Sequence, residues 1–99
     1  MTFSDLIKRR DLTLERSQDR HLVPQLRAWN KGWHDELAAF FTALAQGEVI
    51  ERVDLQRELD NLTARDTQPW NLEYSAYWSG GGAATRWLLS NWEVSASTG

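Results

Sequence analysis

PQLRAWNKGWHDELAAFFTALAQ, residues 24–46, decides the fold of this chain. Its apolar residues recur at steps of mostly three or four, which places them on one stripe of an α-helix: Leu26, Trp29, Trp33, Leu37, Phe40, Phe41 and Leu44. Pro24 suits the first turn of a helix, and Gly47 suits the position just after its end. These residues predict a helix over 24–46 that buries an aromatic stripe.

Weaker helical patterns precede and follow this segment. Residues 4–10 predict a short helix that begins at Ser4, and we expect residues 11–22 to be irregular or weakly helical because the apolar period does not continue. Asp54 suits the N-cap of a helix over 54–65, in which leucines recur at steps of four and three.

Aromatic residues with helical spacing occupy residues 70–78, and Gly80-Gly81-Gly82 follows them. Because glycine adopts many backbone conformations, we expect a hinge at these three residues and a last helix over 83–92. No segment alternates as a strand does. The expected fold is all-α: a small, aromatic-rich bundle of about four helices with a glycine hinge before the last helix.

The organisation follows from these patterns. We expect an N-terminal arm with a short helix over 1–22, a helical domain over 23–93, and a tail over 94–99 that frays because it is small and polar. The length of 99 residues, with 41% hydrophobic and 25% charged residues, fits one small globular domain.

Charge is unevenly distributed along the chain. Residues 8–27 hold six basic and three acidic residues, residues 35–73 are rich in acids, and the net charge is −3. The basic stretch is either a solvated helix face or an arm that docks on an acidic partner. The acidic balance argues against a nucleic-acid partner, which requires a basic surface.

Neither cysteine nor a long apolar run is present. Disulfides, thiolate catalysis and cysteine-based zinc sites are therefore excluded. The N-terminal MTFSDLIKRR lacks the apolar core of a signal peptide, so we expect a cytoplasmic protein with no membrane partner.

No arrangement of residues predicts catalysis or cofactor binding. His21 and His34 share no ligand spacing, so we expect no metal site. Carboxylate pairs such as Glu48 with Glu51, and Asp54 with Glu58, are explained by the favourable interaction of acids with a helix N-terminus. We therefore expect no catalytic residue, no cofactor and no activity from this chain alone.

Six tryptophans are the most unusual feature of the composition. We expect Trp29, Trp33, Trp70 and Trp78 to pack in the core. Trp87 and Trp92 lie between the glycines and the tail, and tryptophan is typical of interface anchors. We interpret these two residues, with Arg86 and Tyr77, as a surface that binds another protein.

The order of several motifs resembles the helical N-terminal segment of the nitrile hydratase β subunit, which its small activator proteins share. After Trp33 come LAAFFTALAQGEV, VDLQRELDNL and EYSAYW, so the likeness covers residues 29–92. It implies a partner that carries the metal, the α subunit, and a secondary contact at Gln56 or Arg57, near the family's arginine. Three consecutive glycines are untypical, and the family's C-terminal barrel is absent, so the likeness implies a split subunit or a metallochaperone-like partner.

Two functional hypotheses stay open, and an independent enzyme is a third alternative. The first is a non-catalytic accessory protein that docks an aromatic helical face on a larger enzyme or subunit, such as a multi-subunit hydratase or lyase. The second is a small inhibitor or regulator, of the kind that phages and plasmids encode, which blocks a partner enzyme. The oligomeric state is left open.

Overall fold

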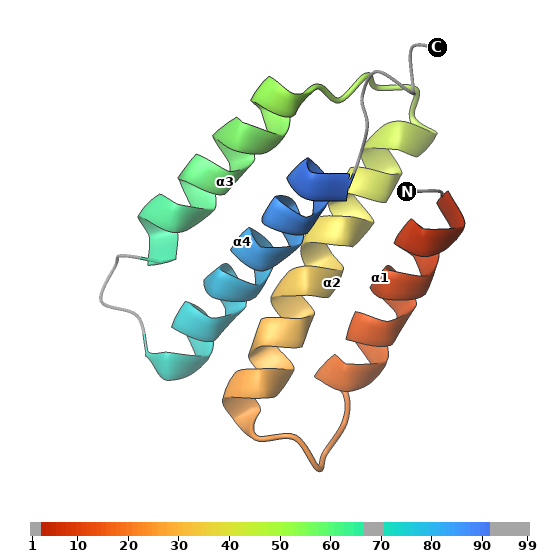
Figure 1. Ribbon diagram of the computed structural model, residues 1–99. Coiled ribbons are helices and arrows are strands. Elements are labelled where there is room, and N and C mark those ends of the chain that lie inside the picture. Colours follow the sequence, from red (N-terminus) through yellow and green to blue (C-terminus); the bar gives the residue numbers. More distant parts are fainter. Residues whose placement is uncertain (1–2, 67–70, 92–99) are drawn as a thin grey trace.

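The computed structural model describes residues 3–66 and 71–91, which form four α-helices and no strand (Figure 1). The helices are α1 (Phe3–Ser17), α2 (Pro24–Ala45), α3 (Arg52–Asp66) and α4 (Leu72–Asn91). The all-α bundle predicted from the sequence is confirmed. Trp70 and Trp92, and the tail over 94–99, lie outside the described residues.

The helices form a central pair with one helix on each side. Consecutive helices run in opposite directions, so α2 and α4 run in the same direction (Figure 1). The most extensive contact joins α2 to α4, while α1 packs on α2 and α3 packs on α4. This arrangement differs from a square four-helix bundle, because the two helices that would lie on a diagonal touch each other directly.

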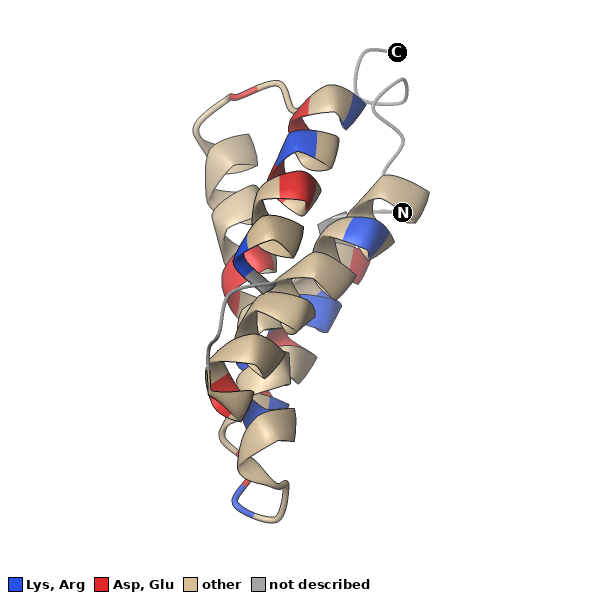
Figure 2. Cartoon of the chain, turned by 90° about the vertical axis from the view of Figure 1, so that its left-hand side faces the viewer, with Lys and Arg blue, Asp and Glu red and all other residues tan. Residues whose placement is uncertain are grey.

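Charged residues are more frequent in the two outer helices, α1 and α3, than in α4. Seven of the fifteen residues in α1 and seven of the fifteen in α3 are charged, whereas α4 carries only Glu73 and Arg86 (Figure 2). The two outer helices therefore present most of the charged surface to water, and the central pair supplies most of the buried residues.

The core lies along the contact between α2 and α4 and is closed by residues of the outer helices. Its buried members come from all four helices: Leu6, Trp33, Leu37, Phe40, Leu55, Ala84 and Leu88. Trp33 lies mid-stripe, as expected, with its ring 5.8 Å from that of Trp29 and 5.9 Å from that of Trp87. The aromatic stripe of α2 thus faces α4 and α1.

Glycine lets α2 and α4 meet at their backbones. A Cβ atom at Gly32 would collide with the carbonyl oxygen of Tyr77 and would lie 2.9 Å from the nitrogen of Gly81. A Cβ at Gly80 would collide with the carbonyl oxygen of Trp29, so the contact is reciprocal. In both places a glycine hydrogen points at a carbonyl oxygen, which is the geometry of a Cα–H···O contact.

The glycine hinge was a wrong prediction. Gly80, Gly81 and Gly82 are buried in the middle of α4, and this helix continues without a break from Leu72 to Asn91. Each glycine weakens a helix by about 1 kcal/mol relative to alanine. Here the close packing on α2 offsets that cost at Gly80, so the glycines mark a helix contact rather than a bend.

For residues 11–22 the sequence predicted irregular or weakly helical backbone, and of these two alternatives residues 11–17 are helical, because α1 extends to Ser17. Its inner face is carried partly by arginines rather than by apolar side chains. The guanidinium of Arg9 lies 5.4 Å from the ring of Trp33 and 5.2 Å from that of Trp87, and Arg10 lies 5.0 Å from Phe41. These cation–π contacts replace the apolar period that the sequence lacks.

The connection between α2 and α3 is short and well capped. Gly47 has a φ of +83°, and its amide donates to Leu44 while the amide of Glu48 donates to Ala43, which closes α2 as predicted. Asp54 is not the N-cap, because α3 begins two residues earlier, at Arg52. Its carboxylate instead accepts the amide of Glu51 at 3.0 Å from within the first turn.

Candidate functional site

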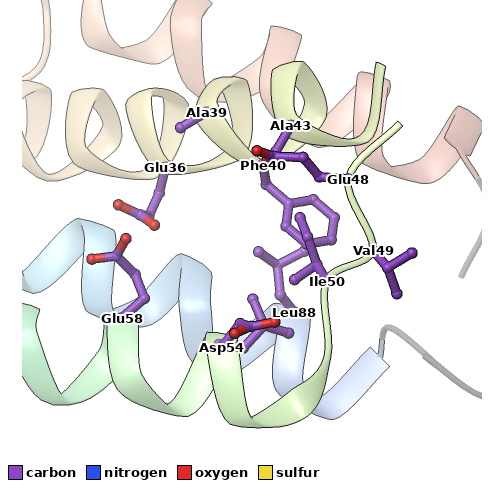
Figure 3. A pocket seen from close by; sticks show the side chains of 11 residues that line it. Glu36, Ala39, Phe40, Ala43, Glu48, Val49, Ile50, Asp54, Glu58 and Leu88 are labelled. Carbon is purple, nitrogen blue, oxygen red and sulfur yellow. The ribbon is translucent and has the colours of Figure 1, made fainter. Parts of the chain in front are cut away.

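A cleft opens between α2 and α3 because α3 packs mainly on α4 (Figure 3). Its volume is about 510 Å³. We call this feature the α2–α3 cleft. It is lined by residues from α2, from the connection after it, from α3 and from α4: Glu36, Ala39, Phe40, Ala43, Glu48, Val49, Ile50, Asp54, Leu55, Glu58 and Leu88.

The floor of the α2–α3 cleft is apolar. Phe40, Leu55 and Leu88 are at most 6% exposed and belong to the core, and Ile50 packs against them from the connection. Val49, at the mouth, is 69% exposed. The core of the bundle therefore continues outward into a surface that an apolar ligand or side chain can reach.

Carboxylates line the α2–α3 cleft above this floor. Glu36 of α2 and Glu58 of α3 point toward each other, and Glu48 and Asp54 lie toward the other end (Figure 3). Among the described residues, no basic side chain lines the cleft. The cleft thus combines apolar contact area with carboxylates, of which Asp54 has a basic neighbour outside the lining, Arg57 at 3.7 Å.

The environment of Glu36 is unfavourable for a carboxylate. Burial raises the pKa of Glu36 to about 7, and the negative charges of Glu58 and Asp35 add to the shift. Within the described part of the chain, neither Glu36 nor Glu58 forms a salt bridge. Near neutral pH, Glu36 therefore exchanges between its charged and neutral forms, and the charged form carries the cost of burial.

Asp35 precedes Glu36 in sequence and has the opposite electrostatic environment. The Tyr77 hydroxyl donates to Asp35 Oδ2 at 2.5 Å, Lys31 Nζ lies 3.3 Å from that oxygen, and His34 Nδ1 lies 3.2 Å from Oδ1. Burial raises the pKa of Asp35, but these hydrogen bonds and the lysine charge outweigh burial and hold that pKa below its ordinary value. Asp35 therefore fastens α2 to α4.

The structure disperses the interface residues predicted from the sequence. Tyr77 is half-buried and bonded to Asp35, and Trp87 is half-buried against Trp33 and Arg9. Arg86 is exposed on α4, and Trp92 lies outside the described residues. Much of the aromatic surface of Tyr77 and Trp87 is thus used in contacts within the chain.

The predicted secondary contacts lie on α3, on the other side of α4 from α1. Gln56 and Arg57 are exposed; Gln56 donates to Asp60 at 3.1 Å, and Arg57 lies 3.7 Å from Asp54. Arg57 thus lies next to a carboxylate of the α2–α3 cleft, whereas Trp87 faces α1. The structure does not bring these two predicted contacts together.

Sequence reasoning missed the α2–α3 cleft itself. The acid-rich composition of residues 35–73 was its only signal, and the spacing of Asp54 and Glu58 had a sufficient explanation in the helix N-terminus. Pairing Glu36 with Glu58 requires knowing that α3 lies beside α2 while packing mainly on α4, which no local pattern indicates.

Two further findings concern the described residues only. No group of three or more histidine, aspartate or glutamate side chains converges in a way that could hold a metal ion. None of the four helices combines the length and the apolar character needed to cross a membrane.

Comparison with known proteins adds no relative: the chain matches no family model, no curated protein and no solved structure. The resemblance to the nitrile hydratase β subunit therefore stays a prediction.

Proposed function

We propose that this chain is a non-catalytic accessory or regulatory protein that binds a helix of a larger protein in the α2–α3 cleft. The observation that carries the proposal is the open cleft between two helices, where the buried core residues Phe40, Leu55 and Leu88 form the floor and the exposed Val49 lies at the mouth. A helix that lies in an apolar groove is a recurring mode of protein recognition, in which side chains at helical spacing anchor on the floor.

The lining of the α2–α3 cleft suits binding better than catalysis. Glu36 and Glu58 could exchange protons, since a carboxylate with a pKa near 7 is typical of a general acid. The side chains of the other described lining residues are apolar, apart from Glu48 and Asp54. A reaction that develops negative charge needs hydrogen-bond donors around it, and these side chains offer none when ionised.

Both roles, accessory subunit and inhibitor, fit a binding site of this kind. An accessory subunit and an inhibitor would both present the cleft to a helix of an enzyme. The nitrile hydratase resemblance is one version of the first role, in which the partner would be the subunit that carries the metal. A functional assay on the captured partner separates the two, because an inhibitor lowers the partner's activity and a subunit supports it.

The chain contains no cysteine, so one introduced cysteine carries one photo-crosslinker. Val49→Cys places it at the cleft, Arg86→Cys places it near the predicted aromatic surface, and Leu14→Cys places it on α1 as a control. We expect Val49→Cys to capture one helical segment of one protein from a lysate of the source cells, with mapping by mass spectrometry. Capture from Arg86→Cys instead would move the binding surface to α4 and contradict the proposal.

A further inference from the structure

Resting on the proposed function, we infer that the partner helix is cationic and that one of its lysine or arginine side chains occupies the space between Glu36 and Glu58. The apolar residues of the same helix would then lie on Phe40, Ile50 and Leu55. The inference names the chemistry of the occupant of the α2–α3 cleft. It follows from three properties of the cleft.

The first property is the sign of the charge. Four carboxylates line the α2–α3 cleft, and no basic residue does so among the described residues. Arg9 and Arg10 of α1 pack against aromatic rings of α2 and α4, and α1 lies on the far side of α2 from α3 (Figure 1). Within the part of the chain that the structure describes, Arg57 lies 3.7 Å from Asp54, but no salt bridge reaches Glu36 or Glu58. A partner with positive charge would therefore complement this acidic pair.

The second property is the direction of the side chains. The carboxylates of Glu36 and Glu58 converge across the cleft from α2 and α3 (Figure 3). On the α4 side Gly81 adjoins Glu36, because a Cβ there would lie 3.7 Å from Glu36 Cγ, and Tyr77, whose hydroxyl is bonded to Asp35, also interacts electrostatically with Glu36; neither residue supplies a positive charge. On α2 itself, Asp35 adds a further negative charge. A cation between the two glutamates would reduce repulsion from each of these groups.

The third property is the apolar floor beside the acidic pair. Glu36 and Glu58 lie toward one end of the cleft, and Phe40, Ile50 and Leu88 lie toward the other (Figure 3). An acidic end followed by an apolar end is complementary to an amphipathic helix in which a basic residue is followed, within one or two turns, by apolar residues. A phosphate-bearing or acidic ligand would meet repulsion from every charged side chain that lines the cleft.

The test uses peptides of unbiased charge. A displayed library of helical peptides about five turns long draws equally on leucine, alanine, lysine, glutamate and glutamine, and selection is made on the full chain. We expect the enriched peptides to combine leucine anchors with lysine and to crosslink to Val49→Cys. Glu36→Gln/Glu58→Gln should weaken their binding by about tenfold or more, since each lost bond to a charged group has a large effect.

The matched control is Glu15→Gln/Glu73→Gln, which removes the same charge from exposed positions on α1 and α4. It should leave the dissociation constant within about twofold. Equal weakening in both double variants would mean that net charge alone attracts the peptides, and would overturn the inference. Thermal unfolding followed by circular dichroism checks that Glu36→Gln/Glu58→Gln is folded.

The remaining outcomes separate the two proposals. Peptides that crosslink to Val49→Cys but carry no lysine would overturn the cationic partner and leave the α2–α3 cleft as a binding site. A library with no peptide that crosslinks there would overturn the proposed function itself. Self-association of the chain that Glu36→Gln/Glu58→Gln abolishes would make the occupant a second copy, and would overturn the assignment to another protein.

Discussion

α2 faces two neighbours in two different ways. Toward α4 it presents Gly32, and the two backbones meet so closely that no Cβ fits between them. Toward α3 it presents Glu36, and the side chains leave a cleft of about 510 Å³. The first contact is closed and leaves no room for a ligand, while the second leaves a cleft with buried core residues at its floor and acids beside them. The difference indicates which contact holds the fold and which is available to a partner.

The adjacent residues Asp35 and Glu36 show the same contrast in electrostatics. Asp35 accepts hydrogen bonds that stabilise its charge, and Glu36 lies near two other carboxylates. Natural proteins commonly retain unfavourable groups where binding requires them. The unfavourable environment of Glu36 in the free chain therefore supports a role of this carboxylate in binding a cation.

The largest expected effect comes from closing the space at Gly80. In Gly80→Ala the new methyl group would collide with the carbonyl oxygen of Trp29 and would force α4 away from α2. We expect the free energy of unfolding to fall by about 3 kcal/mol or more, as in severe overpacking. Urea denaturation followed by circular dichroism measures this loss.

Gly81→Ala is the control, one residue further along α4. Its Cβ would point toward α3, at an ordinary contact distance of 3.5 Å from the methyl carbons of Leu62. We expect this variant to be more stable than the wild type by about 1 kcal/mol, because alanine favours the helix. If both alanine variants lost stability equally, the close α2–α4 contact would not be what requires glycine at position 80.

The next effect concerns the fastening of α2 to α4 by Tyr77. Tyr77→Phe removes the donor to Asp35, so we expect a loss of about 2 kcal/mol, as for a hydrogen bond to a charged group. Because the folded pKa of Asp35 lies below the ordinary 3.8, this stabilisation is complete above pH 3.8 and is lost as the pH falls through the lower folded pKa. Urea denaturation of both proteins across this range measures the difference, and an unchanged difference at low pH would contradict the assignment.

The smallest expected effect concerns Glu36, on the side of α2 that faces α3. The pKa of Glu36 is about 7 in the folded chain and 4.5 ordinarily, so folding favours the protonated form. The stability of the wild type relative to Glu36→Gln should therefore fall as the pH rises from about 4.5 to about 7. Partial exposure limits this effect, and we expect Glu36→Gln to be more stable at pH 8 by about 1 kcal/mol. Parallel pH profiles of the two proteins would contradict the raised pKa.

Helical periodicity predicted much of the fold, but it did not predict the contacts between helices. The stripe from Leu26 to Leu44 and the glycine after it predicted α2 to within one residue of its end, because burial of one face repeats along the helix. The period failed in α1, where Arg9 and Arg10 cover aromatic rings that belong to other helices. From the sequence alone, a charged residue is predicted to be exposed, even where it packs against an aromatic ring of another helix.

The candidate site was less predictable than the fold. The three consecutive glycines suggested a hinge because glycine is conformationally free. The structure gives another reason for one of them: Gly80 packs against the backbone of Trp29 in α2, where a Cβ atom would not fit. Glu36 and Glu58 belong to separate helices, and their approach follows from the packing of α3 on α4. Contacts between residues that are far apart in the sequence cannot be predicted from the spacing of residues within one helix.

The reciprocal contact at Gly32 and Gly80 has a consequence for the route of folding. These residues are separated in the chain by the whole of α3 and its two connections, so the central contact closes a long loop before the core can form. α1 and α3 each bury only two of their described residues, whereas α2 buries five and α4 six. We expect the amide hydrogens of α2 and α4 to exchange last, and α1 and α3 to detach from and re-form against the assembled α2–α4 pair. α3, which forms one wall of the α2–α3 cleft, is thus one of the two helices that we expect to open at the lowest cost in free energy.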